Sequence, residues 1–255
     1  MTPAERAARA GLAALLALAT LGARPAPRPA PLAPAGKLAP DIVLARYARA
    51  LATLERPHAI AFDYAVEQLG LRNMEQTHRV YRSGLDERDE TRNVDGYELK
   101  RPSVRILANR TYRYDIAATA PKPASYRFAY AGAYPHGNAY TYVFRTASFA
   151  TTPFDVTEVE IDGTHFLPSL VRFKIAGDAA RGSGELAYAP NGRYWVVVNA
   201  QVSAHLANGT TAHEHIAWSD YSFPTSLPPS TFEAPHPHAV EETEAGSGAA
   251  EASSP

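Results

Sequence analysis

The sequence contains no cysteine. This absence excludes a disulfide framework, a thiolate nucleophile and a cysteine-ligated metal site. A charge excess of one sign is also missing, because the net charge is -1, so electrostatics give no reason to expect a nucleic-acid partner. Methionine occurs only 2 times, whereas tyrosine occurs 14 times. Since aromatic rings pack well on a pleated surface, this composition favours β structure over helix.

Several catalytic motifs are missing as well. The sequence has no GxSxG nucleophile elbow and no HExxH zinc motif. Glycine-containing stretches such as "RGSGELAY" do not lead into a helix, which argues against a phosphate-binding loop. The sequence therefore predicts no catalytic residue, no metal site and no cofactor.

The N-terminal stretch has the composition of a secretory signal peptide. Arg6 and Arg9 precede an uninterrupted small and apolar run from Ala10 to Ala19. This run is too short to span a membrane comfortably, and small residues at Ala19 or Ala23 suit cleavage. We therefore expect a signal peptide over residues 1–23 and export to the periplasm or cell envelope; an uncleaved N-terminal anchor is the alternative.

The remaining chain divides into a linker, one domain and a tail. Residues 24–40 are rich in proline and alanine and predict an extended linker. Residues 234–255 are acidic, small and without periodicity, which predicts a disordered tail. The globular part is then a single domain over residues 41–233, long enough to bury a sizeable core.

This domain opens with one helix and continues as strands. Apolar residues at helical spacing predict a helix over 41–56, capped by Asp41 and ended by Pro57. The period then changes to two. One half-buried strand is indicated by residues that alternate with smaller or polar ones: Ile60, Phe62, Tyr64 and Val66.

Turn signals then separate a long series of alternating segments. Asp162-Gly163, Asn191-Gly192 and Asn208-Gly209 each supply the positive φ that tight hairpins need. Another turn at Asn109-Arg110 predicts a strand over 112–116. Nine to eleven sequential strands make an antiparallel meander, and a sheet this long curls. We predict a mainly β fold: a single curled antiparallel sheet, an unclosed β-barrel with the N-terminal helix as lid.

The curled sheet implies an apolar hollow on its concave face. One helix of about 15 residues is about 22 Å long and does not cover ten strands. An apolar ligand would fit the uncovered part. Six residues are the candidates for lining it, although the sequence leaves open which strand face is concave: Ile60, Phe62, Tyr64, Val66, Phe128 and Tyr142.

Two polar groups invite a catalytic or metal-binding interpretation. His213 and His215 share a strand face, and His205 lies across the Asn208-Gly209 turn, so three imidazoles could approach a zinc ion. Only one cross-strand pairing of His205 with His213 is compatible with that turn, and surface histidines are the preferred interpretation. In "LDERDETRNVDG" (85–96), acids alternate with arginines, which predicts a solvated hairpin rather than a catalytic carboxylate pair.

The last strand follows from the alternation in "HEHIAWSDYSF". Ile216 and Trp218 share a face with Glu214, whereas the histidines, Ala217 and Tyr221 share the other face. Pro224, Pro228 and Pro229 then forbid further ladder pairing.

Three stretches together resemble the LolA/LolB-like superfamily of periplasmic carriers, which includes lipoprotein-sorting proteins and RseB-type domains. They are "TEVEIDGTHFLPSLVRFKI", "SGELAYAPNGRYWVVVNAQVSAHLANGTTAHEHIAWSDYSF" and "FPTSLPPSTF". The resemblance covers residues 40–233. It implies an unclosed barrel with a helical lid and a cavity that shields acyl chains of a lipoprotein or lipid from water.

These observations favour an exported, non-enzymatic carrier or binding protein for lipoprotein acyl chains or another apolar ligand. Its partners would be the lipid or lipoprotein acyl chain and a membrane-associated donor or acceptor protein. An RseB-like envelope sensory or interaction module is the alternative. A metal-dependent hydrolase using His205, His213 or His215 is the third hypothesis.

Overall fold

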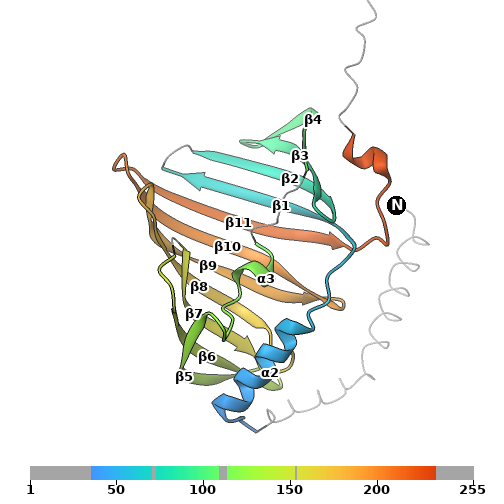
Figure 1. Cartoon of the computed structure of the whole chain (residues 1–255). Helices are drawn as coiled ribbons and strands as arrows, with labels where there is room; N and C mark the ends of the chain where they lie inside the picture. The colour runs from blue at the N-terminus through green and yellow to red at the C-terminus, as the bar shows by residue number, and fades with distance from the viewer. Residues whose placement is uncertain (1–35, 71–72, 109–113, 153, 234–255) are drawn as a thin grey trace, which may run out of the picture.

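The computed structural model describes residues 36–70, 73–108, 114–152 and 154–233. The predicted signal peptide, most of the predicted linker and the predicted tail lie outside these residues. The described part folds around one antiparallel sheet of 11 strands, accompanied by helix α2 (Pro40–Ala52) and two single-turn helices (Figure 1). None of the described helices has the length and apolar character needed to cross a membrane.

The strand order shows two meanders joined side by side. The order is β4-β3-β2-β1-β11-β10-β9-β8-β7-β6-β5. The first meander contains β1 (Ala59–Leu69), β2 (Met74–Ser83), β3 (Asp86–Val94) and β4 (Tyr97–Leu107). The second contains β5 (Tyr126–His136), β6 (Ala139–Ser148), β7 (Phe154–Asp162), β8 (Pro168–Ala176), β9 (Ala180–Asn191), β10 (Tyr194–Leu206) and β11 (Thr211–Ser222). Strands β4 and β5 remain edges, so the barrel is unclosed, as predicted.

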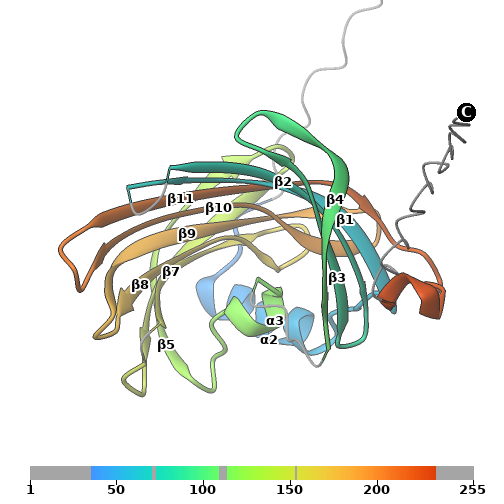
Figure 2. The same cartoon turned by 90° about the horizontal axis from the view of Figure 1, so that it is seen from above.

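Helix α2 lies across the hollow of the curled sheet (Figure 2). It begins at Pro40, whose missing N–H costs nothing in the first turn, and it ends at Ala52, earlier than predicted. Asp41 was predicted to cap it, but the N-cap is Ala39 without a side-chain bond, and Asp41 lies in the first turn. The helix buries Val43 and Tyr47 completely against the sheet.

Two hydrogen bonds fix this helix to the rest of the fold. The Tyr47 hydroxyl donates to the Pro121 carbonyl at 2.8 Å. The Leu38 amide, just before the helix, donates to the Tyr142 hydroxyl at 2.8 Å. Buried polar groups need such partners, so both bonds help to define how the helix sits on the sheet.

A second helix, α3 (Ile116–Thr119), also enters the hollow, which the sequence did not predict. The alternation of Tyr112, Tyr114 and Ile116 was interpreted as a strand, and this is wrong where the chain is described. Asp115 accepts a hydrogen bond from the Ala117 amide and starts a helical turn instead. Residues 109–113 lie outside the described part.

Two of the three predicted tight turns are confirmed. Gly192 and Gly209 adopt φ values of 61° and 83°, which side chains rarely tolerate. Asp162-Gly163 does not form a two-residue hairpin turn, because β7 ends at Asp162 and β8 begins only at Pro168. The Asp162 carboxylate accepts from the amides of Thr164 and His165, and Phe166 takes the positive φ of 55°. A wider Asx-stabilised loop thus replaces the predicted hairpin turn.

The end of β11 departs from strict alternation. Asp220 adopts a φ of 50°, and the pairing with β1 shifts register between Ala61 and Asp63. This bulge turns Tyr221 toward the inner face, where its ring packs on Phe62 at 5.4 Å. The prediction that Tyr221 shares the face of His213 and His215 is therefore wrong.

We expect the stability of the fold to depend on the apolar side of the sheet. Ile161 in β7 is 0% exposed, whereas Ile42 in α2 is 43% exposed. Ile161→Ala should lower the free energy of unfolding by about 2–5 kcal/mol through lost burial and a cavity. Ile42→Ala should change it by less than about 1 kcal/mol. Urea unfolding of both variants checks this; equal effects would contradict the assigned core.

Candidate functional site

The six side chains predicted to line a hollow all face the concave side, in two groups. Ile60, Phe62, Tyr64 and Val66 point inward from β1, which resolves the face that the sequence left open. The other two, Phe128 and Tyr142, lie on β5 and β6; the Phe128 ring meets Tyr47 of α2 at 6.0 Å. Their role as ligand contacts stays a prediction.

The concave face changes character across the sheet. Over β5–β10 it is apolar and is covered by α2 and α3, with side chains such as Val159 and Val171 fully buried. Over β2–β4 it is polar. One register row illustrates the gradient, because Phe62 pairs with Val80, Val80 with Asp89 and Asp89 with Arg105.

A compact polar cluster forms the inner face of β2 and β3. His78 and Asp89 are 7% and 6% exposed, and the His78 Nδ1 atom lies 2.7 Å from Asp89 Oδ1. The Tyr64 ring stacks on the His78 ring at 4.4 Å. Its hydroxyl donates to Asp89 Oδ2 at 3.3 Å. Next to them, Arg82 donates to Glu87 Oε2 at 2.6 Å. The buried carboxylates of Asp89 and Glu87 therefore each have hydrogen-bond partners within the cluster.

This cluster corrects the interpretation of residues 85–96 as a solvated hairpin. Every second residue of β3 points inward, so Glu87 and Asp89 are buried while Arg88 and Arg92 lie on the outer face. The interleaved charges are therefore sorted by strand alternation. A signal was present in the sequence, because the Ser83-Gly84 turn brings Arg82 opposite Glu87.

The environment of Tyr64 raises the pKa of its hydroxyl above the usual value of 10.0. Burial is the largest cause, since it disfavours the charged phenolate, and the negative charge of Asp89 adds to it. The Tyr64 hydroxyl also donates a hydrogen bond to the Asp89 carboxylate, and this bond stabilises the neutral form of Tyr64.

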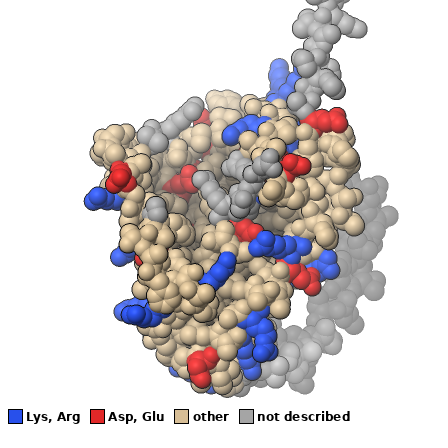
Figure 3. All heavy atoms as spheres, viewed as in Figure 1, with Lys and Arg blue, Asp and Glu red and all other residues tan. Residues whose placement is uncertain are grey.

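A cavity of about 200 Å³ lies where the apolar and polar parts meet. Its ring and aliphatic side chains come from β1, β2, β11 and the segment before α3: Phe62, Tyr64, Val66, Val80, Tyr114, Ile216 and Trp218. Its polar side chains come from β2, β3, β4 and β11: Gln76, His78, Glu87, Asp89, Arg105 and Glu214. In the space-filling view, acidic and basic side chains lie intermixed over the β1–β4 half of this side (Figure 3).

Helix α2 does not cover this cavity, since no α2 residue lines it. Three of the six predicted residues, Phe62, Tyr64 and Val66, line the cavity directly. Phe128 and Tyr142 belong to the covered core instead. The sequence did not indicate that most of the polar side chains named above line a cavity.

The comparisons with known proteins add structural neighbours. One is a domain described as that of an outer membrane lipoprotein-sorting protein from Vibrio parahaemolyticus, with 14% identity and a TM-score of 0.44, covering 74% of this chain and 95% of that chain. Another is a LolA superfamily protein from Nitrosomonas europaea, with 10% identity and a TM-score of 0.37, covering 78% and 99%. The chain is similar to LolA superfamily proteins. The proteins found in this way include a member of the superfamily that the sequence was expected to resemble.

A DUF1329 family protein from Desulfovibrio piger is also similar, with 9% identity and a TM-score of 0.41, covering 76% of this chain and 96% of that chain. No family model matches the chain, and no curated protein matches it.

The outer face of the sheet carries the three candidate zinc ligands of the sequence, His205, His213 and His215. The register places His213 opposite Ser203 and His205 opposite Thr211, so the expected pairing of His205 with His213 does not form. His215 contacts Asn199 at 2.7 Å. Within the described ranges, no three His, Asp or Glu side chains gather as a metal site.

A second and larger hollow, of about 610 Å³, lies over these strands. Alternation assigns most of its lining to the outer face, including His213, His215, Gln201 and Arg172. Two charged residues of this lining, Arg172 and Glu185, form an ion pair with each other, and Arg172 also pairs with Glu158 and Glu160.

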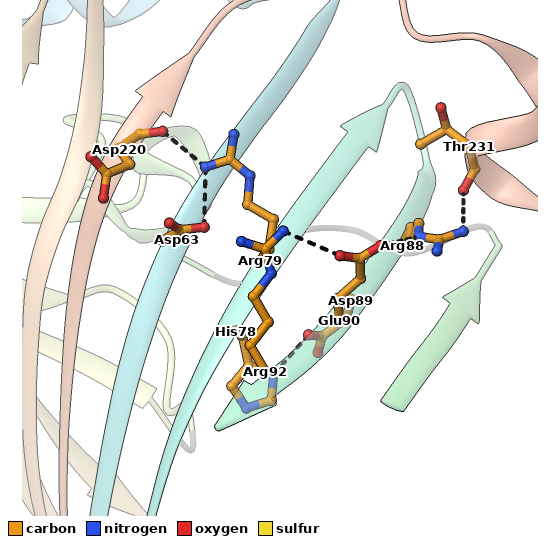
Figure 4. A network of polar contacts seen from close by, with 9 residues as sticks. All are labelled: Asp63, His78, Arg79, Arg88, Asp89, Glu90, Arg92, Asp220 and Thr231. Carbon is orange, nitrogen blue, oxygen red and sulfur yellow. Dashed lines mark hydrogen bonds and ion pairs between the residues drawn. The ribbon is translucent and has the colours of Figure 1, made fainter. Parts of the chain in front are cut away.

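Outer-face arginines also hold the chain that follows β11. Arg79 donates to Asp63 and to the carbonyl of Asp220, and Arg88 donates to the carbonyl of Thr231 at 3.1 Å (Figure 4). Thr231 belongs to η1 (Pro229–Phe232), so these bonds fix the exit segment against β1–β3. They are structural contacts on the face opposite the cavity.

The raised pKa of Tyr64 predicts a loss of stability at alkaline pH. An unfolded tyrosine ionises near 10, whereas folded Tyr64 keeps its proton to higher pH. Its contribution is fully present below pH 10 and decreases as pH rises toward the folded pKa, at up to about 1.4 kcal/mol per pH unit. Urea unfolding between pH 8 and pH 11 should show a shallower decline for Tyr64→Phe than for the wild type. Tyr97→Phe, at a position 78% exposed, is the control; identical slopes for all three proteins would refute the assignment.

Proposed function

We propose that this chain is an exported, non-enzymatic carrier or binding protein for an acyl chain or another apolar ligand. The ligand would lie on the concave face between β1 and β11. The observation that carries the proposal is the cavity of about 200 Å³, lined on that side by Phe62, Val66, Ile216 and Trp218. Apolar surface in a cavity attracts a ligand because its removal from water is favourable.

The cavity as it stands is smaller than the roughly 300–1,000 Å³ of typical ligand pockets. A long chain therefore needs additional space on the concave face, and α2 and α3 lie over the β5–β10 part of that face (Figure 2). Helix α2 is held by the fully buried Val43 and Tyr47 and by the hydrogen bonds of Tyr47 and Leu38. Its half-buried apolar side chains also pack on the core: Leu44, Ala50 and Leu51. It is the element that can leave with the least disruption of the sheet.

The energies permit this exchange. Exposing Val43 and Tyr47 costs about 1.5–3 kcal/mol each, or about 3–6 kcal/mol together. The half-buried side chains of α2 and the two hydrogen bonds add to this cost. Each methylene group of a ligand gains about 0.8 kcal/mol on burial. A chain therefore needs more than about eight methylenes to offset the displacement of α2. This magnitude supports a ligand with a long acyl chain over a small apolar molecule.

The proposal predicts that apolar ligands depend on the inner face of β1. Val66 is half-buried and lines the cavity, whereas Leu69 on the same strand is 45% exposed and points outward. Val66→Lys should weaken binding of a fluorescent fatty-acyl probe by at least about tenfold, since the ammonium group meets the chain. Leu69→Lys should leave the affinity unchanged. Fluorescence titration of both variants measures this.

Mass spectrometry of lipids that copurify with the protein supplies the independent test. We expect acyl lipids in the wild type and their loss in Val66→Lys. A protein that carries no lipid, binds no acyl probe and instead retains an envelope protein would contradict the carrier proposal and favour the interaction module.

A further inference from the structure

The cavity combines aromatic rings with carboxylates in a way that selects a particular polar group. Its ring side chains are Phe62, Tyr64, Tyr114 and Trp218, with the Tyr114 ring edge-on to Trp218 at 5.0 Å. The faces of such rings carry negative electrostatic potential and attract organic cations. These four rings can therefore bind two kinds of group: an apolar chain or an alkylated ammonium group.

The charge at the β11 end of the cavity favours the cation. Its described lining carries three carboxylates, Glu87, Asp89 and Glu214, against a single guanidinium, Arg105. Glu87 and Asp89 are bonded to Arg82 and His78 inside the sheet. Arg105 lies opposite Asp89 in the β3–β4 register, so the positive charges of the lining and its surroundings lie beside Glu87 and Asp89. Glu214 remains as the carboxylate at the β11 end.

Glu214 differs from the other two. It is half-buried on β11 and faces the cavity, as the sequence alternation predicted. Its cross-strand neighbours are Val202 and Gln68, and neither can supply a positive charge. Within the described part of the chain, Glu214 forms no hydrogen bond or ion pair. A half-buried carboxylate without a partner carries a desolvation cost that a bound cation would relieve.

We propose that this cavity binds an alkylated ammonium group, with Glu214 as the counter-charge and the rings of Trp218 and Tyr114 as the aromatic wall. The inference deepens the proposed function, since the ammonium would be the polar end of an amphiphile whose chain lies along β1 and β11. A volume of about 200 Å³ suits such a head group better than a whole long chain. A free small amine shares the same chemistry and is distinguished by the experiment.

The test compares probes that share one chain and differ in the head group. Dodecyltrimethylammonium, dodecyl sulfate and dodecanol are titrated into the full chain by calorimetry, below their micelle concentrations, and tetramethylammonium is titrated separately. We expect dodecyltrimethylammonium to bind at least about tenfold more tightly than dodecyl sulfate. Glu214→Gln should abolish this preference while leaving the affinity for dodecanol unchanged.

Glu67→Gln is the matched control, because Glu67 lies on neighbouring β1 but is exposed on the outer face. It should behave as the wild type with every probe. Thermal unfolding of both variants verifies that they fold. This is expected, since neither carboxylate forms a hydrogen bond or ion pair within the described ranges.

The outcomes separate this inference from the carrier proposal. Binding of dodecanol without any preference among the charged probes would overturn the ammonium site and leave the carrier proposal intact. Binding of tetramethylammonium that requires Glu214, in a protein that binds no dodecanol, would support the ammonium site for a free amine and overturn the carrier proposal. Tighter binding of dodecyl sulfate, or an equal effect of Glu214→Gln on dodecanol, would overturn the inference.

Discussion

The hydrogen-bonded pairing of β1 with β11 is the interaction on which the rest of the structure depends. It joins strands from opposite ends of the domain and converts two meanders into one curled sheet. Its register sets Tyr64 beside Trp218 and Val66 beside Ile216, and these four side chains line the cavity. If one of the two strands slipped by one residue, its two cavity side chains would turn to the outer face. The position of the cavity therefore follows from one long-range pairing.

The two halves of the concave face satisfy different physical requirements. Over β5–β10 the side chains are apolar, so helices must cover them, and α2 and α3 do so. Over β2–β4 the inner side chains include acids and bases, which stay buried because Asp89 meets His78 and Glu87 meets Arg82. The cavity at the boundary is consequently amphipathic, as a site for an amphiphile requires.

Local patterns predicted much of this fold from the sequence. Alternation located β1 and the face shared by Glu214, Ile216 and Trp218, and the turns at Gly192 and Gly209 are where asparagine-glycine pairs placed them. Such features depend on residues within one hairpin. The sequence also predicted an antiparallel curled sheet under a single main helix.

What sequence reasoning missed depends on contacts between distant elements or on backbone irregularity. The burial of Asp89 requires His78 and Tyr64 from two other strands, and without that register its flanking arginines suggested a solvated hairpin. Tyr221 changes face because Asp220 adopts a positive φ. Helix α3 begins at the Asp115 side chain, within an alternation that resembled a strand.

The central claim is that an apolar chain lies on the concave face against β1 and β11. The most direct measurement is a crystal structure of the protein with dodecanol bound. Our account predicts the chain against Val66, Ile216 and Trp218, with α2 shifted from its position over the sheet. Dodecanol bound only in the outer-face hollow beside His213 and His215, with α2 unmoved, would contradict it.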